Sequence, residues 1–281
     1  MEYDMDDHEY EIELDGALNL AKLAGSIMMQ YYDQDYDVEQ KEGHQAPESA
    51  ILTEVDEKID KLVQLYFQQN WADDGLLTEE TTAKGEWHKS DRIWIVDPID
   101  GTMGYKKKTE CFGISIALIE DDRPVLGVLY APAQKLLAYA IQGKGSYLNG
   151  EKIDLGQNSR IKNIICSRNA YQRRGYQKIL QKLNPDDELG LVTLESVVVK
   201  AIRILQKEGE IYPVLPLSKR VKSVPKFWDI AAADIIIHEA GGLLTDFVGK
   251  KYRYNISDFR CKGGVLTGTQ KGHNYALDKL K

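Results

Sequence analysis

The sequence has few cysteines, no apolar run of membrane length and no excess of positive charge. Cys111, Cys166 and Cys261 are odd in number, widely separated and lack zinc-ligand spacing, which favours reduced thiols in a reducing compartment. No apolar run approaches the roughly 20 residues that a membrane helix needs. The formal net charge is -8, which argues against a protein that binds nucleic-acid duplexes through a basic face.

The first residues, MEYDMDDHEYEIELDG, are acidic and lack the basic-then-apolar order of a secretory signal. We therefore expect a cytoplasmic protein with no membrane partner. The chain has 281 residues, of which 43% are hydrophobic, so it is long enough for a full core in one large domain or two modest ones.

Apolar periodicity divides the chain into two sets of elements. In the first set we expect a helix over 15–32, a loop over 37–50 and a helix that begins near Thr53 or Glu54. Strands joined by tight turns follow at 92–96, 112–120, 124–130 and 135–141, which indicates an antiparallel or mixed sheet.

The second set contains expected strands at 163–167 and 211–215 and expected helices at 171–183 and 196–210. A further helix over 228–242 would have Asp229 as its N-cap and Gly241 and Gly242 past its end, before two more strands. The polar stretch 156–162 separates the two sets. We expect an N-terminal α+β half that binds metal and phosphate over 1–157, and a C-terminal α/β substrate half over 158–281.

Two carboxylates stand at the end of the apolar run in IWIVDPIDGT. Asp-Pro-x-Asp-Gly can be ordinary turn chemistry. However, Asp97 follows a strand at its carboxyl end, where ligand crevices of α/β proteins form, and crowded carboxylates repel unless a cation offsets them. Asp97 and Asp100 therefore suit Mg²⁺, and the amides of Gly101 and Thr102 suit an anion such as phosphate.

Other acids have ordinary alternatives when each is taken alone. Glu79, in the pair that follows GLLT, could simply be solvated. Asp229 could only cap its helix, and Asp56 could face solvent. Lys106, Lys107 and Lys108 form either a solvated loop or a cationic site for phosphate.

Taken together, the Glu-Glu pair after a strand, WIVDPIDGT and WDIAAADIIIHEAGG resemble the inositol monophosphatase superfamily of Mg²⁺-dependent, typically lithium-sensitive phosphatases. Within it, DPIDGTMGYKKK, SVVVKAIRILQKEGEIYP and ICSRN look most like the 3'(2'),5'-bisphosphate nucleotidases. The resemblance implies a layered α/β sandwich of the sugar-phosphatase αβαβα type, with mixed sheets. Its active site would lie between two halves that each supply ligating acids.

The resemblance also implies a role for each matching residue. About two to three Mg²⁺ ions would occupy the site. The metal ligands would be Glu79, Asp97, the carbonyl of Ile99, Asp100 and Asp229. Asp56, Thr102 and Glu79 would help to activate water, and the substrate would contact Gly101, Thr102, Ser167, Arg168 and Lys200. Lys200 borders an apolar helix stripe, so it could instead be a lysine whose stem covers the core while its charge reaches water.

Several positions depart from the nucleotidase pattern. Met103 and Tyr105 replace a usual lysine and phenylalanine, the loop before Asp56 reads HQAPESAILT, and Arg168 and Asn169 stand where a histidine is usual. These departures spare the metal ligands but affect the choice of substrate.

The expected activity is hydrolysis of the 3'(2')-phosphate of adenosine 3'(2'),5'-bisphosphate to give AMP and phosphate. The alternatives are an inositol-1-phosphate or fructose-1,6-bisphosphate phosphatase and, from a different class, a non-catalytic phosphate-binding protein. A complete set of acids argues against the last. The expected partner is a small phosphate ester rather than a nucleic-acid polymer, and the chain would be a monomer or a homodimer.

Overall fold

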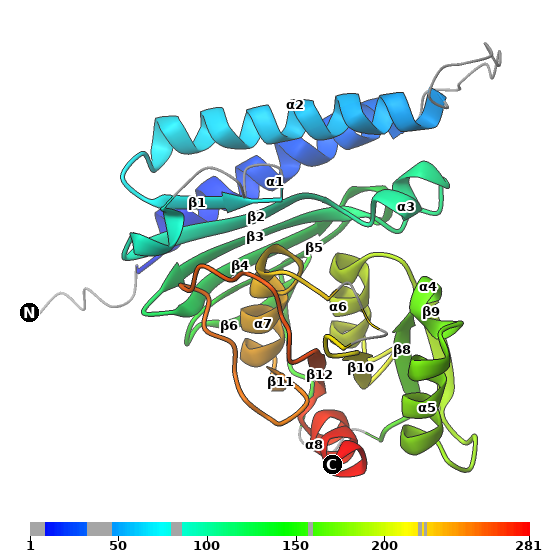
Figure 1. Cartoon of the computed structure of the whole chain (residues 1–281). Helices are drawn as coiled ribbons and strands as arrows, with labels where there is room; N and C mark the ends of the chain where they lie inside the picture. Colours follow the sequence, from blue (N-terminus) through cyan, green and yellow to red (C-terminus); the bar gives the residue numbers. More distant parts are fainter. Residues whose placement is uncertain (1–8, 33–46, 80–85, 157–159, 219–220, 222–223) are drawn as a thin grey trace, which may run out of the picture.

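Layers alternate through the molecule in the order helix, sheet, helix, sheet, helix (Figure 1). This computed structural model describes residues 9–32, 47–79, 86–156, 160–218, 221 and 224–281. Residues 1–8 of the acidic start and most of the loop expected over 37–50 lie outside the described residues, and the rest of the acidic start includes the first turn of helix α1 (Glu11–Tyr32). The layered α/β fold expected from the sequence is confirmed.

The first sheet has its strands in chain order, as strands joined by short turns usually do. Strand β1 runs parallel to β2, and each later strand is antiparallel to the one before it. The strands are β1 (Gly75–Thr78), β2 (Arg92–Asp100), β3 (Gly113–Glu120), β4 (Arg123–Ala131), β5 (Leu136–Ile141), β6 (Gly145–Leu148) and β7 (Glu151–Ile153). Short 3₁₀ turns, Trp87–Lys89 and Pro132–Gln134, precede β2 and β5.

Two amphipathic helices cover the upper face of this sheet in Figure 1: α1 (Glu11–Tyr32) and α2 (Pro47–Asn70). Alternate β2 residues, Trp94 and Val96, point to this face and pack with α1 and α2 in one apolar cluster. Helix α2 begins earlier than the sequence indicated. Pro47 is its first residue, a position where the missing proline N–H removes no helical hydrogen bond.

Helices α6 (Val197–Leu205) and α7 (Phe227–Glu239) lie between the two sheets. The sequence of α7, FWDIAAADIIIHE, is apolar on almost every side, which is typical of a helix buried all round. Its residues share one core with β2 and β4 from the first half and with β10 and β12 from the second. The boundary near 156–162 therefore stays a prediction, since this core crosses it.

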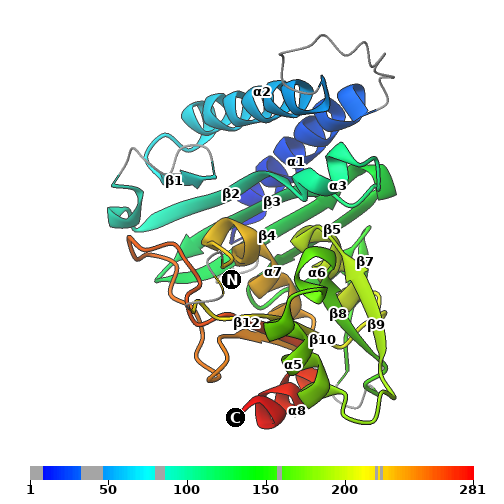
Figure 2. The ribbon, with the colours of Figure 1, turned by 45° about the vertical axis from the view of Figure 1, so that its right-hand side comes forward.

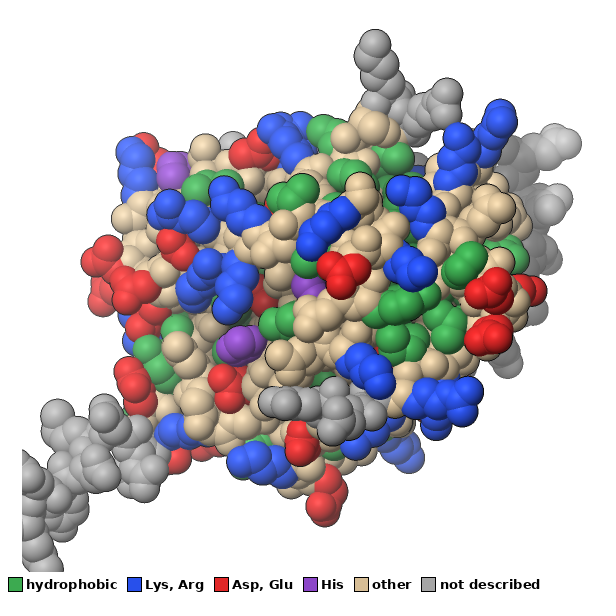
Figure 3. Space-filling view, turned by 90° about the horizontal axis from the view of Figure 1, so that it is seen from below, with side chains coloured by type: hydrophobic (Ala, Val, Ile, Leu, Met, Phe, Trp, Pro, Cys, Tyr) green, Lys and Arg blue, Asp and Glu red, His purple; other side chains and the backbone are tan. Residues whose placement is uncertain are grey.

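The second sheet is mixed, in the order β11-β12-β10-β8-β9. Its strands are β8 (Asn163–Ser167), β9 (Gly190–Leu194), β10 (Ile211–Val214), β11 (Gly242–Thr245) and β12 (Val265–Thr269). Helices α5 (Arg174–Leu183) and α8 (Gln270–Leu280) cover its outer face, where Ile164 and Cys166 of β8 pack against them. Figure 2 shows α5 and α8 below α6 and α7. Figure 3 shows that lysines and arginines are interspersed with acidic and apolar side chains on the underside of the molecule.

In the described part of the chain, no helix combines the length and the apolar character that crossing a bilayer requires.

One buried histidine links α8 to the second sheet and should make stability depend on pH. His273 is 2% exposed, and its Nε2 lies 2.8 Å from the Thr245 hydroxyl. Burial lowers the pKa of His273 below its ordinary value. The unfolded chain therefore binds more protons below about pH 6.5, so stability is lost as pH falls through that window.

Acidification from about pH 7.5 to pH 5.5 should lower the free energy of unfolding of the wild type. In His273→Gln this decrease should be smaller, by up to about 1.4 kcal/mol, because the buried histidine is gone. Urea titrations of the metal-free protein at both pH values test this. His238→Gln, at an exposed position on α7, is the control and should follow the wild type. Equal acid sensitivity in His273→Gln and the wild type would contradict the assignment.

Candidate active site

A β-bulge brings the two acids of β2 to the same face of the first sheet. Residues three apart on a regular strand point to opposite faces. Here Asp97 pairs with Ser115 and Asp100 pairs with Gly113, so β2 has one extra residue between the two pairs. Ile99 consequently points toward α1 and α2, while both carboxylates point toward α6 and α7.

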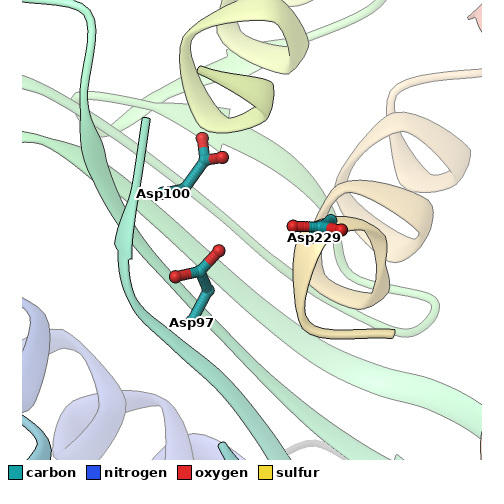
Figure 4. A group of neighbouring side chains, drawn as sticks. All are labelled: Asp97, Asp100 and Asp229. Atoms are coloured by element: carbon teal, nitrogen blue, oxygen red, sulfur yellow. The ribbon is translucent and has the colours of Figure 1, made fainter. Parts of the chain in front are cut away.

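Asp97, Asp100 and Asp229 meet at this point (Figure 4). Each supplies a carboxylate oxygen, and these oxygens all lie within 4.8 Å of one another. Asp229 comes from the first turn of α7, so the cluster joins the end of a strand to the start of a helix that follows it by nearly half the sequence. The expectation that acids from both halves of the chain converge is confirmed.

Asp97 is the carboxylate least compensated by the protein. It is 1% exposed, and among the described residues its buried Oδ1 has no hydrogen-bond partner. Burial, followed by the charges of Asp100 and Asp229, raises the pKa of Asp97 well above its ordinary value. A buried oxygen without a donor suits a metal ion.

Asp100 is held at the start of α6. Its Oδ2 accepts a hydrogen bond from the Ser196 hydroxyl and another, 2.7 Å long, from the backbone amide of Val198. Burial raises the pKa of Asp100, and these two donors oppose that rise because they stabilise the ionised form. The helix terminus therefore fixes this carboxylate in place.

The sequence prediction that Asp229 is an N-cap is wrong. Lys226 occupies the N-cap position, and Asp229, three residues later, accepts a 2.6 Å hydrogen bond from the backbone amide of Lys226. An acid at the third helical position also stabilises the start of a helix, because its carboxylate accepts a hydrogen bond from the backbone amide of the N-cap residue. The sequence alone therefore could not show whether Asp229 occupies the N-cap or the third position. Burial raises the pKa of Asp229 to about 7.

Glu79 lies at the edge of the three-carboxylate group. It follows β1, which pairs with β2 in parallel, so the parallel register carries it toward the same end of the sheet. Its charge contributes to the raised pKa of Asp97, although burial is the larger cause. Glu79 is exposed and lies outside the set of oxygens within 4.8 Å. Its role as a metal ligand, and that of the Ile99 carbonyl, stay predictions.

The backbone after Asp100 packs closely against neighbouring elements, and only a glycine fits there. Gly101 has φ +83°, a left-handed conformation, and a Cβ there would lie 2.5 Å from the Cys111 carbonyl oxygen and 2.7 Å from the Ser196 Cβ. Thr102 opens the short helix α3 (Thr102–Lys106), and among the described residues no hydrogen bond is donated by the amides of Gly101 or Thr102. Helix α2, which carries the half-buried Asp56, packs against α3. A contact between Asp56 and Thr102 stays a prediction.

The residues expected to bind the substrate differ in their surroundings. Ser167 ends β8 and precedes α4 (Arg168–Tyr171), and the Arg168 side chain is 55% exposed. Lys200 is 1% exposed, its Nζ donates a 2.8 Å hydrogen bond to the Glu195 carbonyl, and it lies 5.2 Å from the centre of the Tyr212 ring. Its ammonium therefore does not reach water as a solvated lysine would.

Sequence reasoning missed the turn between β9 and α6, which includes Glu195 and Ser196. Ser196 caps α6 by accepting a hydrogen bond from the amide of Val199. A serine directly before an apolar helical run is a helix-start signal, so it could have been found. Its contact with Asp100 depends on long-range packing and has no signature in sequence.

These features define a class: layered α/β proteins with an oxygen-rich acidic centre at a strand end. Comparison with known proteins gives the family. The model of the inositol monophosphatase family matches residues 10–279, so the chain belongs to this family.

Individual proteins agree with this assignment. The chain is similar to a fructose-1,6-bisphosphatase/inositol-1-monophosphatase of Thermotoga maritima, with 29% identity over 256 residues that cover 90% of this chain and 92% of that protein. Its fold resembles inositol monophosphatase-II of Staphylococcus aureus, with a TM-score of 0.78, 20% identity and 96% of each chain covered. A structure of 2'-AMP-bound SaIMPase-II gives a TM-score of 0.74 at 21% identity, covering 96% of this chain and 94% of that one.

We predict that Asp97→Asn raises the melting temperature of the metal-free protein by roughly 2–4 °C and abolishes the further rise caused by Mg²⁺. Removing one charge relieves the repulsion among the buried acids, and about 1 kcal/mol corresponds to such a shift. Calorimetry with and without Mg²⁺ measures both effects.

Asp234→Asn is the matched control, because Asp234 lies on the same helix as Asp229 but outside the cluster, where it accepts a hydrogen bond from Tyr254. It should keep the Mg²⁺ response. A wild-type-sized Mg²⁺ response in Asp97→Asn would remove Asp97 from the metal site.

Proposed function

We propose that this protein is a Mg²⁺-dependent phosphomonoesterase that acts on small phosphate esters. The observation that carries the proposal is the set of three carboxylates within 4.8 Å, one of which has a buried oxygen without a donor among the described residues. Crowded buried carboxylates are destabilising when ionised, and a bound cation offsets both their burial and their repulsion. Oxygen ligands of this kind fit Mg²⁺.

Asp97, Asp100 and Asp229 would hold Mg²⁺, with Glu79 and the Ile99 carbonyl as further ligands. When bound, Mg²⁺ neutralises phosphate oxygens and lowers the pKa of water, which makes water a nucleophile near neutral pH. Burial and the neighbouring carboxylates raise the pKa values of Asp97 and Asp229, and a bound cation would offset both effects.

The chain itself orients the ester. The amides of Gly101 and Thr102 are available to bind the phosphate oxygens, and the missing side chain of Gly101 permits the close packing on Cys111 and Ser196. Asp56 and the Thr102 hydroxyl would orient the attacking water and accept its proton. Because Asp100 is already fixed by Ser196 and Val198, the centre needs little rearrangement when a substrate binds.

Inositol and sugar phosphates are the first substrate class. The Thermotoga maritima relative carries both activities in its name, and its similarity extends over 90% of this chain. Lithium inhibition, which the family resemblance implies, belongs to the same proposal.

Adenosine 3'(2'),5'-bisphosphate is the second candidate. The spacing from Lys200 to Tyr212 and Pro213 favours it, and a structural neighbour binds 2'-AMP, which is a nucleotide monophosphate. The burial of Lys200 weakens the case, since the lysine was expected to meet the second phosphate.

With Mg²⁺, we expect the wild type to release phosphate from inositol-1-phosphate faster than from adenosine 3',5'-bisphosphate, and fructose 1,6-bisphosphate completes the panel. Asp229→Asn should lower kcat at least about a hundredfold on every substrate, because one metal ligand is lost. Lithium is titrated in the same assay. Asp234→Asn is again the control. If Mg²⁺ causes no phosphate release from any of these esters, the proposal is refuted and a phosphate-binding protein is favoured.

Lys200→Met separates the two substrate classes. If Lys200 contacts the second phosphate of a nucleotide, its loss should raise the KM for the bisphosphate about ten- to a hundredfold more than that for a monophosphate. If it only supports the Glu195 carbonyl and Asp100, we expect similar losses on both substrates and a lower melting temperature. Initial rates on both substrates and calorimetry decide the matter, and we expect the second outcome.

A further inference from the structure

The turn between β9 and α6, Glu195 and Ser196, borders the candidate active site from the second half of the chain. Ser196 donates to the Asp100 carboxylate, and its Cβ is the close neighbour of the Gly101 backbone. Glu195 therefore stands one residue from the contact that joins α6 to the acidic cluster. The site roles assigned above do not use its side chain.

Glu195 carries a charge that the protein has almost wholly removed from water. Its side chain is 5% exposed and forms an ion pair with Arg168, whose Nε lies 2.9 Å from the Glu195 Oε1. The Arg168 side chain is 55% exposed, and its Nη2 donates a long hydrogen bond of 3.5 Å to the Thr193 carbonyl. The charge of Glu195 also helps to raise the pKa of the Cys111 thiol, although burial is the larger cause. The Cys111 Sγ accepts a hydrogen bond from the backbone amide of Ser196, the residue next to Glu195. The carboxylate thus belongs to the surroundings of the phosphate-binding turn.

The Glu195–Arg168 ion pair should disfavour esters that carry a second phosphate and tolerate esters whose leaving group carries hydroxyl groups. An arginine recognises a phosphate best when its fork of N–H donors is free, and here the Nε is already occupied by a carboxylate. A second phosphate near this turn would also meet the negative charge of Glu195 in a poorly solvated place. Hydroxyl groups of a leaving group would suffer no such repulsion, because they can donate to a carboxylate.

We propose that Glu195, paired with Arg168, is a specificity-determining residue that selects esters whose leaving group carries no second phosphate. The inference rests on the proposed phosphatase function and narrows its substrate class to monophosphates of hydroxyl-rich compounds, so of the proposed sugar phosphates fructose 1,6-bisphosphate would be selected against. It works by exclusion, since a repulsive element built into a site discriminates between ligands that the rest of the site binds equally.

The test compares kcat/KM for adenosine 3',5'-bisphosphate with kcat/KM for inositol-1-phosphate in wild type and variants. Glu195→Gln removes the charge and releases Arg168, so the bisphosphate-to-monophosphate ratio should rise at least about tenfold. Glu195→Ser should do the same, because the loss of charge and not the replacement causes the gain. Adding Arg168→Met to Glu195→Gln should cancel most of it, since the released guanidinium is then absent.

Glu208→Gln is the matched control. Glu208 pairs with Arg203 at the opposite end of α6, 3.3 Å from its Nη1, so this substitution removes an ion pair remote from Asp100. It should leave the ratio unchanged. An unchanged ratio in both Glu195 variants, or equal losses on the two substrates, would overturn the inference.

A binding measurement separates the inference from the proposed function. In the presence of Mg²⁺, the rise in melting temperature caused by each ester reports affinity without turnover. If the wild type releases no phosphate, yet Glu195→Gln gains stabilisation by the bisphosphate alone, the phosphatase proposal fails and the selection by Glu195 stands. If the wild type is active, but the Glu195 variants change neither the ratio of kcat/KM values nor the stabilisation by the bisphosphate, the phosphatase proposal stands and the selection by Glu195 fails.

Discussion

Mutual repulsion among buried carboxylates is the constraint on which the site depends. Asp97, Asp100 and Asp229 bring carboxylate oxygens within 4.8 Å of one another, where water cannot fully screen the charges of the ionised forms. The surrounding fold compensates unevenly. Asp100 receives the Ser196 hydroxyl and an amide of α6, Asp229 receives an amide of its own helix, and Asp97 keeps an oxygen without a donor among the described residues. The protein thus fixes two of the carboxylates by hydrogen bonds and, within the described ranges, leaves an oxygen of the third without a protein donor, as the proposed cation site requires.

The need to bury α7 on almost every side explains why this centre forms where two sheets meet. A helix with the sequence FWDIAAADIIIHE has apolar residues around most of its surface and exposes His238 only near its end, so one sheet cannot cover it. Two sheets enclose it, and its first turn then projects Asp229 toward the end of β2. The packing of α7 therefore also places Asp229 in the three-carboxylate group, and core substitutions in α7 should change the geometry of that group.

Much of this arrangement could be predicted from sequence, and the failures have physical causes. Periodicity predicted the strands β2 to β5 and the long helices, and motif resemblance predicted the family and the convergence of Asp97, Asp100 and Asp229. The bulge that turns Asp100 could not be predicted, because strand alternation is local while the extra residue is defined against β3. The burial of Lys200 was ambiguous for the same reason: its position beside an apolar stripe is visible in sequence, but the Glu195 carbonyl that receives it is not.

The distance along the chain between β2 and α7 also bears on how the protein is made. A nascent chain exposes Asp97 and Asp100 long before Phe227–Glu239 leaves the ribosome, and synthesis proceeds at about 5–20 residues per second. During that interval β2 lacks the helix that covers it and the acid that completes the cluster. The three-carboxylate group can therefore form only late in biosynthesis, after α7 has docked, and a product truncated before α7 would retain the IWIVDPIDGT motif without the complete group.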